Sequence, residues 1–170
     1  MDTYKNILIE RAKNIAGKKK NENQLSEETI SVVEFLLSPE RYAFEDKYVS
    51  EVLSLKEITI IPGTPAFVMG VINLRGRIIS ILNLKILFKL KERGLTELNK
   101  VIVLKNEKME FGVVVDSISG NKKLLINSLN PQPITLDNIG KEYIAGVYQD
   151  GLILLNASNL LSSKQIIFTN

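Results

Sequence analysis

The residue types that most often carry chemistry are scarce in this chain. It contains no His and no Cys, which removes the commonest general base, the commonest transition-metal ligand and every thiolate or disulfide. Catalysis would therefore rest on carboxylates, Lys, Ser or Thr. The best Gly-spaced candidate for a phosphate loop lacks the Lys-Ser/Thr ending of such loops. Its glycines are expected to serve turns and close backbone contacts instead: Gly63, Gly70 and Gly76.

Two groups of carboxylates are the remaining candidates for chemistry. Asp116 follows the apolar run GVVV at 112–115, a strand end where a catalytic carboxylate can sit. No partner acid or base is marked near it, so an Asp that caps a turn is the simpler interpretation. Glu45 and Asp46 are adjacent, but no further oxygen ligands stand at a set spacing for a cation. The residues give no support to an enzyme.

Two other features suit binding. In the segment VSEVL at 49–53, strand alternation predicts that Val49, Glu51 and Leu53 share one face. That face fits a partner-facing patch with a polar rim, and it equally fits an amphipathic strand with an ordinary exposed Glu. Arg75 is expected at the tip of a tight turn, and Arg is enriched among interface hot spots, although most exposed arginines only contact solvent. The pattern leaves both pairs of alternatives open.

The elements that must position these residues are mostly β-strands. Short runs rich in β-branched and aromatic residues, separated by turn signals, predict strands at 30–37, 41–44, 49–54, 58–61, 70–74, 77–83, 100–105, 110–116, 117–126, 142–148 and 152–156. A weak helical turn and a charged loop are expected at 84–99, and a short last helix runs through Leu160 and Leu161 with Asn156 or Ser158 as its cap. These strands predict an all-β barrel or sandwich, and no repeat of fixed period is evident.

The chain is expected to divide at residue 30. Residues 1–29 predict an amphipathic helix at 3–16 and a polar linker whose triple Lys is interpreted as solvated rather than as a nucleic-acid patch. With 45% hydrophobic residues, 30–170 can bury a core, and the net charge of +3 mainly bears on solubility. The sequence has neither a signal peptide nor an apolar run of membrane-spanning length, so a cytoplasmic location is expected.

Several segments resemble one known family. The segment TPAFVMGVINLRGRII at 64–79 is similar to the hallmark of CheW-like domains, a G-V-x-N-L-R-G core followed by an apolar strand. Three further regions resemble other parts of the family pattern, and they are 42–52, 111–118 and the hairpin at 143–156. The resemblance runs from about residue 30 to 162, so the chain is identified as a member of the chemotaxis coupling-protein family.

That resemblance implies a fold and a function. The implied fold is all-β, with two tandem five-stranded SH3-like barrels, a short N-terminal helix and a short C-terminal helix. The implied function is that of a non-catalytic adaptor without cofactors, which links the cytoplasmic tip of chemoreceptors to the regulatory domain of the CheA histidine kinase. Such a protein would be recruited to receptor arrays at the inner face of the membrane. It would bind no nucleic acid, insert into no membrane and be monomeric when isolated. The alternative is a scaffold of the same fold that serves a CheA-like kinase in a non-chemotactic pathway.

The resemblance also implies a receptor-binding site at the groove between the barrels. Carried over by position, Arg75 and Asn73 would face the receptor, with Val49 and Glu51 near the groove. Gly70 would allow a close backbone approach. The residues that meet the kinase are not assigned.

The chain departs from the family pattern after the Arg-Gly turn. Where the family often has V-P-[IV]-x-D-L-R, this chain has ISILNLK at 79–85. Ser80 replaces the Pro and Asn83 replaces the Asp, which removes any salt bridge from that Asp and puts the local loop geometry in question. The N-terminal helix and lysine-rich linker are additions to the minimal domain.

Overall fold

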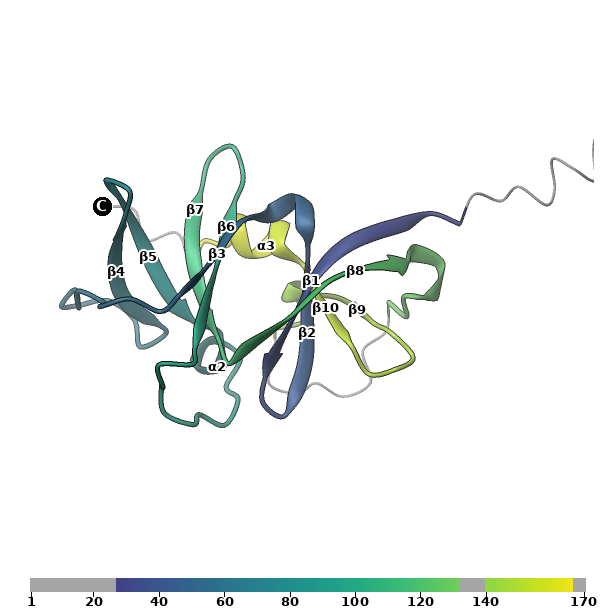
Figure 1. Cartoon of the computed structure of the whole chain (residues 1–170), viewed down its shortest axis with the longest axis horizontal. Helices are drawn as coiled ribbons and strands as arrows, with labels where there is room; N and C mark the ends of the chain where they lie inside the picture. Colours follow the sequence, from purple (N-terminus) through teal and green to yellow (C-terminus); the bar gives the residue numbers. More distant parts are fainter. Residues whose placement is uncertain (1–26, 132–139, 167–170) are drawn as a thin grey trace, which may run out of the picture.

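The first two strands of the chain belong to the same barrel as its last strands. The computed structural model describes residues 27–131 and 140–166, which form two five-stranded barrels side by side (Figure 1). The first barrel has five consecutive strands, which are β3 (Val49–Ser54), β4 (Val68–Leu74), β5 (Arg77–Asn83), β6 (Lys100–Lys105) and β7 (Glu110–Val115). The second barrel has β1 (Thr29–Leu37), β2 (Glu40–Glu45), β8 (Ser117–Leu125), β9 (Ile144–Val147) and β10 (Ile153–Leu155).

The two barrels share one topology. The strand order is β3-β6-β7-β5-β4 in the first barrel and β8-β1-β2-β10-β9 in the second. Each contains one parallel pair at the matching place, β5 with β7 and β10 with β2. An isolated bridge joins the two edges in each case, between Thr59 and Val71 in the first barrel and between Asn130 and Val147 in the second. The two barrels therefore have the same strand arrangement, but the chain passes through its positions in a different sequential order.

Three hydrophobic cores result from this arrangement. One lies within the first barrel and one within the second, and the largest lies between the barrels, where it takes buried residues from β1, β2, β5, β6, β7 and β10. In β6 the side chains alternate, since Val101 and Val103 point into the first barrel while Ile102 and Leu104 join the core between the barrels. Strands with both faces buried read as continuous apolar runs, as VIVL and VVV do here.

The all-β fold predicted from the sequence is confirmed, and so is its last helix. That helix, α3 (Ala157–Ser162), begins at Asn156, whose side chain accepts a 2.9 Å hydrogen bond from the backbone N–H of Asn159. The expected strand at 58–61 is wrong, because only Thr59 pairs there and Pro62 with Gly63 then turns the chain away. The helix expected at 3–16 and most of the linker lie outside the described residues.

Asn83, where the chain departs from the family pattern, caps the short helix that follows it. The one-turn helix α2 (Leu84–Leu87) follows β5, and the Asn83 side chain accepts hydrogen bonds from the backbone N–H groups of Lys85 at 3.0 Å and Ile86 at 3.4 Å. An Asn cap satisfies these donors as an Asp would, without the charge.

Candidate functional site: the ion-pair end of the first barrel

The turn between β4 and β5 places Arg75 at the tip of a hairpin. Arg75 and Gly76 are its two central residues, with φ of 52° and 82°, and positive φ at both positions is the pattern of a type I′ turn. The side-chain oxygen of Asn73 accepts a 2.8 Å hydrogen bond from the backbone N–H of Gly76. Asn73 therefore shapes the turn that presents Arg75.

A left-handed backbone is costly for Arg, roughly 1–2 kcal/mol relative to a residue that tolerates it. Such strain at an exposed position favours a role for the side chain itself. We expect Arg75→Asn, which creates the preferred Asn-Gly turn, to raise the unfolding free energy by about 0.5 kcal/mol in urea denaturation. A loss of more than about 1 kcal/mol would instead mean that the ion pair of Arg75 dominates the turn.

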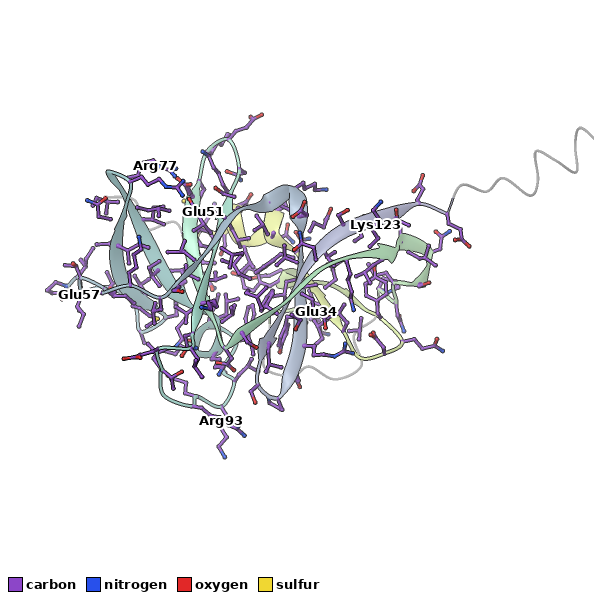
Figure 2. The ribbon with its side chains drawn as sticks, in the orientation of Figure 1. Glu34, Glu51, Glu57, Arg77, Arg93 and Lys123 are labelled. Atoms are coloured by element: carbon purple, nitrogen blue, oxygen red, sulfur yellow. The ribbon has the colours of Figure 1, made fainter. Side chains whose placement is uncertain are left out.

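Four charged residues meet at this end of the first barrel. The Arg75 guanidinium lies 3.2 Å from a carboxylate oxygen of Glu51, and the Arg77 guanidinium lies 4.0 Å from the other oxygen. Arg77 also pairs with Glu110, the first residue of β7. Figure 2 shows Glu51 and Arg77 together near the β4–β5 turn. Arg75 is 77% exposed while Glu51 is 20% exposed, so the carboxylate is held in the barrel wall and the guanidinium extends into solvent. Glu51, Arg75, Arg77 and Glu110 are called the ion-pair end below.

The prediction that Val49 shares a face with Glu51 and Leu53 is wrong. The pairing of β3 with β6 shifts between Val49 and Glu51, which is a β-bulge, so Val49 lies opposite Leu104 while Glu51 lies opposite Val103. The extra residue reverses the alternation. Val49 therefore packs against the core between the barrels, whereas Leu53 packs into the first barrel.

A shallow concavity of about 500 Å³ lies beside Val49. It is lined by residues 47–50 and by the β6–β7 turn at 105–107. Its lining includes Tyr48 and two basic residues, Lys47 and Lys105. Val49 thus borders a hollow between residues 47–50 and the β6–β7 turn, and Glu51 lies two residues further along β3.

Gly70 lies away from the ion-pair end. Its φ is +138°, and a Cβ at this position would lie 2.2 Å from the backbone oxygen of Thr59. The close approach expected at Gly70 is therefore made by this chain's own backbone. A contact between Gly70 and a partner stays a prediction.

Sequence reasoning missed Arg77 and Glu110. Arg77 follows the turn directly, and its pairing with Leu74 across the hairpin is a signal that could have placed it beside Arg75. Glu110 is 33 residues from Arg77 and precedes an ordinary apolar strand. No signal in the sequence distinguishes it from the other exposed-looking Glu residues.

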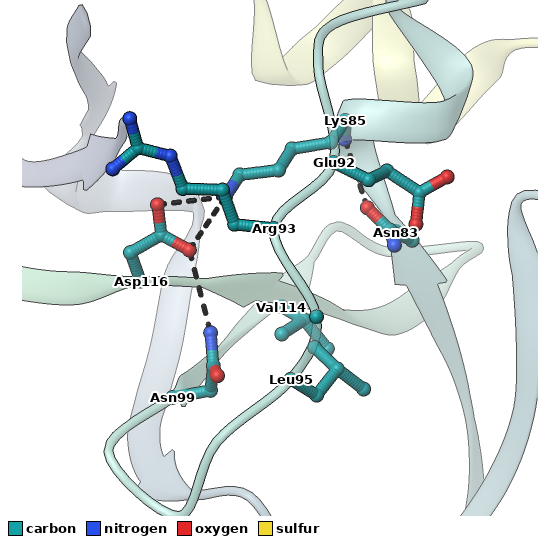
Figure 3. Close-up of a pocket in the computed structure, with 9 residues that line it drawn as sticks. Asn83, Lys85, Glu92, Arg93, Leu95, Asn99, Val114 and Asp116 are labelled. Carbon is teal, nitrogen blue, oxygen red and sulfur yellow. Dashed lines mark hydrogen bonds and ion pairs between the residues drawn. The ribbon is translucent and has the colours of Figure 1, made fainter. Parts of the chain in front are cut away.

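Asp116 joins the two barrels and is not a catalytic group in a cleft. Its carboxylate accepts hydrogen bonds from the Lys85 ammonium at 2.7 and 2.8 Å (Figure 3). It also accepts one from the backbone N–H of Ser38 at 2.7 Å. Ser38 belongs to the β1–β2 turn of the second barrel, so the expected turn-capping role is present alongside a buried ion pair. The adjoining cavity measures about 20 Å³, the size of a water site rather than a ligand site.

The other predicted carboxylate pair is also accounted for. Glu45 pairs with Lys47 at 2.6 Å, on the surface. Within 27–131 and 140–166, no group of three His, Cys, Asp or Glu side chains is placed to hold a metal ion. No helix in that part of the chain has the length and apolar composition that a membrane crossing requires.

The matching end of the second barrel carries a second polar cluster. Arg41 lies 3.1 Å from both Glu34 and Asp150, and Glu34 also pairs with Lys122 at 2.6 Å. Desolvation acts to raise the pKa of Asp150, but the backbone N–H of Leu152 and the Arg41 guanidinium outweigh it and hold that pKa below its ordinary value. The turn residue is Asp150 here and Arg75 in the first barrel, so the two matching turns carry opposite charges.

The two barrels share one core, and the ion-pair end lies exposed at one end of the first barrel. A sequence model described as "CheW-like domain" matches residues 31–165, and the chain belongs to the CheW-like family. The chain is 32% identical to "Chemotaxis protein CheW" of Treponema pallidum over 149 residues, 84% of this chain and 88% of the relative. It is 28% identical to "Protein FrzA" of Myxococcus xanthus, which covers 74% of this chain and 81% of that relative.

A solved structure supports the same fold. The scaffolding protein TtCheW from Thermoanaerobacter tengcongensis superposes with a TM-score of 0.69 at 30% identity, covering 78% of this chain and 88% of that one. The names chemotaxis protein and scaffolding protein agree with the expectation of a non-catalytic protein.

Proposed function

We propose that this protein is a cytoplasmic, non-catalytic adaptor that couples chemoreceptors to a CheA-type histidine kinase and is recruited to receptor arrays. The observation that carries the proposal is Arg75, an exposed Arg held in a left-handed turn and oriented by Glu51. Membership in the CheW-like family supports the adaptor role. Asn73 and Val49 are proposed to take part, Asn73 through the turn and Val49 through the concavity beside the ion-pair end.

The physical scheme requires two binding surfaces on one rigid body. A receptor tip is a helical hairpin, and a groove on a protein surface accepts one face of a helix through spaced anchors. The kinase regulatory domain would bind a separate surface. Joining two weak contacts on one rigid body raises their effective concentration for each other. The core between the barrels supplies that rigidity.

The first experiment is calorimetric titration of the protein with the purified regulatory domain of a CheA-type kinase, followed by a soluble receptor hairpin. Saturable one-to-one binding to both partners is expected. Binding to neither at high micromolar concentration would contradict the proposal. Binding to a CheA-like kinase domain from a pathway unrelated to motility, without receptor binding, would favour the alternative scaffold.

Arg75→Glu is expected to weaken the receptor complex at least about tenfold, because a hot-spot Arg contributes more than about 1.4 kcal/mol. The unfolding free energy should change by less than about 1 kcal/mol, since the Arg75 guanidinium is 77% exposed and its pair is screened by solvent. Both quantities are measured on the same protein, by calorimetry and by urea denaturation.

The matched control is Arg93→Glu, the same charge reversal on an exposed Arg at the opposite end of the first barrel (Figure 2). It should leave receptor affinity within about twofold, since distant exposed charges are screened by salt. Equal loss in both variants would mean that overall charge, not Arg75, governs binding. Unchanged binding in Arg75→Glu would remove Arg75 from the interface.

A further inference from the structure

The ion-pair end contains one residue whose role is not explained by contact with a partner. We propose that Glu110 is a positioning residue for the binding site, because by holding Arg77 it leaves Glu51 free to orient Arg75. This inference rests on the proposed function of Arg75. It adds that Glu110, at the start of β7, influences the orientation of the exposed Arg75 guanidinium through Arg77 and Glu51.

The four side chains form a line in which the charges alternate. Glu51 stands between two guanidiniums, 3.2 Å from that of Arg75 and 4.0 Å from that of Arg77. Glu110 is the closer partner of Arg77. The two carboxylates are 20% and 18% exposed, whereas both guanidiniums are far more exposed. The two carboxylates are therefore the more firmly held groups, and Arg77 is the guanidinium that lies within ion-pair distance of both.

Burial explains why Glu110 retains Arg77. One carboxylate oxygen of Glu110, Oε1, is buried without a hydrogen-bond partner. Over the described ranges, Arg77 is the cation within ion-pair distance of Glu110. A half-buried carboxylate loses hydration and is stabilised by a paired cation more strongly than an exposed one is. Arg77 is thus drawn toward Glu110 and away from Glu51.

Loss of the charge on Glu110 would change the partner of Arg77. The Arg77 guanidinium would need to move only about 1 Å to reach charge-assisted hydrogen-bond distance from Glu51, which is now 4.0 Å away. Glu51 would then be shared by two guanidiniums. Arg75 would lose part of its anchor and sample more rotamers.

Orientation of Arg75 matters for what it binds. A guanidinium has five donors in one plane and recognises a carboxylate best when two parallel N–H groups face it. Glu51 contacts one terminal nitrogen of Arg75, which leaves other donors directed to solvent. An oriented Arg75 is therefore suited to an acidic side chain on the partner, and ordering it in advance lowers the entropy lost on binding.

The test uses three variants of the full chain without any partner. In Glu110→Gln, the NMR signal of the Arg75 side-chain Nε–Hε group is expected to shift toward that of a free Arg and to exchange faster with water. The matched control is Glu107→Gln, which removes the same charge from an exposed position on the same hairpin and should leave the signal unchanged. The double variant Glu110→Gln with Arg77→Gln removes the competitor for Glu51, so the Arg75 signal should return toward its original position.

Glu110→Gln and the double variant are then titrated with the receptor hairpin at about 0.3 M salt, where the changed net charge is screened. Affinity is expected to fall about three- to tenfold in Glu110→Gln and to recover in the double variant. A merely structural role for Glu110 would make the double variant worse than the single one. That outcome, or an Arg75 signal indifferent to Glu110→Gln, would overturn the inference. Failure of the proposed function would appear elsewhere, as receptor binding indifferent to Arg75→Glu.

Discussion

Gly70→Ala is expected to lower the unfolding free energy by about 3 kcal/mol, the largest loss at any glycine of the first barrel. Two independent costs combine. The φ of +138° is one that residues with a Cβ rarely adopt. The added Cβ would also lie 2.2 Å from the backbone oxygen of Thr59 and 2.8 Å from a side-chain carbon of Ile58. A backbone oxygen cannot yield as the end of a flexible side chain does.

The clash falls on the contact that closes the first barrel. Thr59 and Val71 exchange two backbone hydrogen bonds of 2.9 Å each, and Val71 is the neighbour of Gly70. Moving Thr59 away to admit a methyl group breaks that bridge. The second barrel repeats the arrangement, since a Cβ on Gly146 would lie 2.6 Å from the backbone oxygen of Asn130, which bridges to Val147.

Urea denaturation of Gly70→Ala and of Gly76→Ala separates the two costs. Gly76 also has positive φ, +82°, but nothing lies within 4 Å of a Cβ built there. Gly76→Ala should therefore show only the backbone cost, about 1 kcal/mol. If both variants lost the same amount, the contact with Thr59 would have no energetic weight.

Asp116→Asn is the second change with a large expected effect, a loss of about 2–3 kcal/mol. Lys85 is 7% exposed, and its ammonium has both oxygens of Asp116 within 2.8 Å. The amide keeps an oxygen for the backbone N–H of Ser38 but leaves the Lys85 charge buried without its counter-charge. The loss is placed below that of a fully buried pair because Asp116 is partly open to solvent.

A double-mutant cycle checks the cause. Lys85→Met removes the ammonium that lacks a counter-charge and keeps a side chain of similar length. The double variant Lys85→Met with Asp116→Asn should therefore regain at least about 1.5 kcal/mol of unfolding free energy relative to Asp116→Asn alone. Glu45→Gln, which breaks the exposed pair with Lys47, is the control and should cost less than about 0.5 kcal/mol. Additive losses in the cycle would show that Asp116 acts through Ser38 and not through Lys85.

Much of the fold could be predicted because turn residues in the sequence mark where individual strands begin and end. β3, β5 and β6 begin and end at the predicted residues. In the clearest case, a two-residue turn at Arg75-Gly76 fixes the start of β5 at Arg77. The sequence offers two caps for the last helix, Asn156 and Ser158, and the structure uses Asn156.

The remaining features depend on contacts that no local pattern encodes. The bulge at Val49 is visible only in the pairing with β6. The pair of Arg77 with Glu110 joins residues from different strands, and that of Lys85 with Asp116 joins a helix to the junction of the barrels. The shared topology also escaped detection, because the second barrel uses β1 and β2 at places where the first uses β6 and β7. A search for repeats of fixed period cannot find a permuted copy.

That permutation sets an order of events during synthesis. The five strands of the first barrel leave the ribosome one after another, within residues 49–115, so this barrel can form while the rest is being made. β1 and β2 emerge earlier, yet their partners β8 and β10 emerge only after the first barrel is complete. The β1–β2 hairpin therefore stays without its partner strands, with two strand edges unpaired, until β8 and β10 have been synthesised.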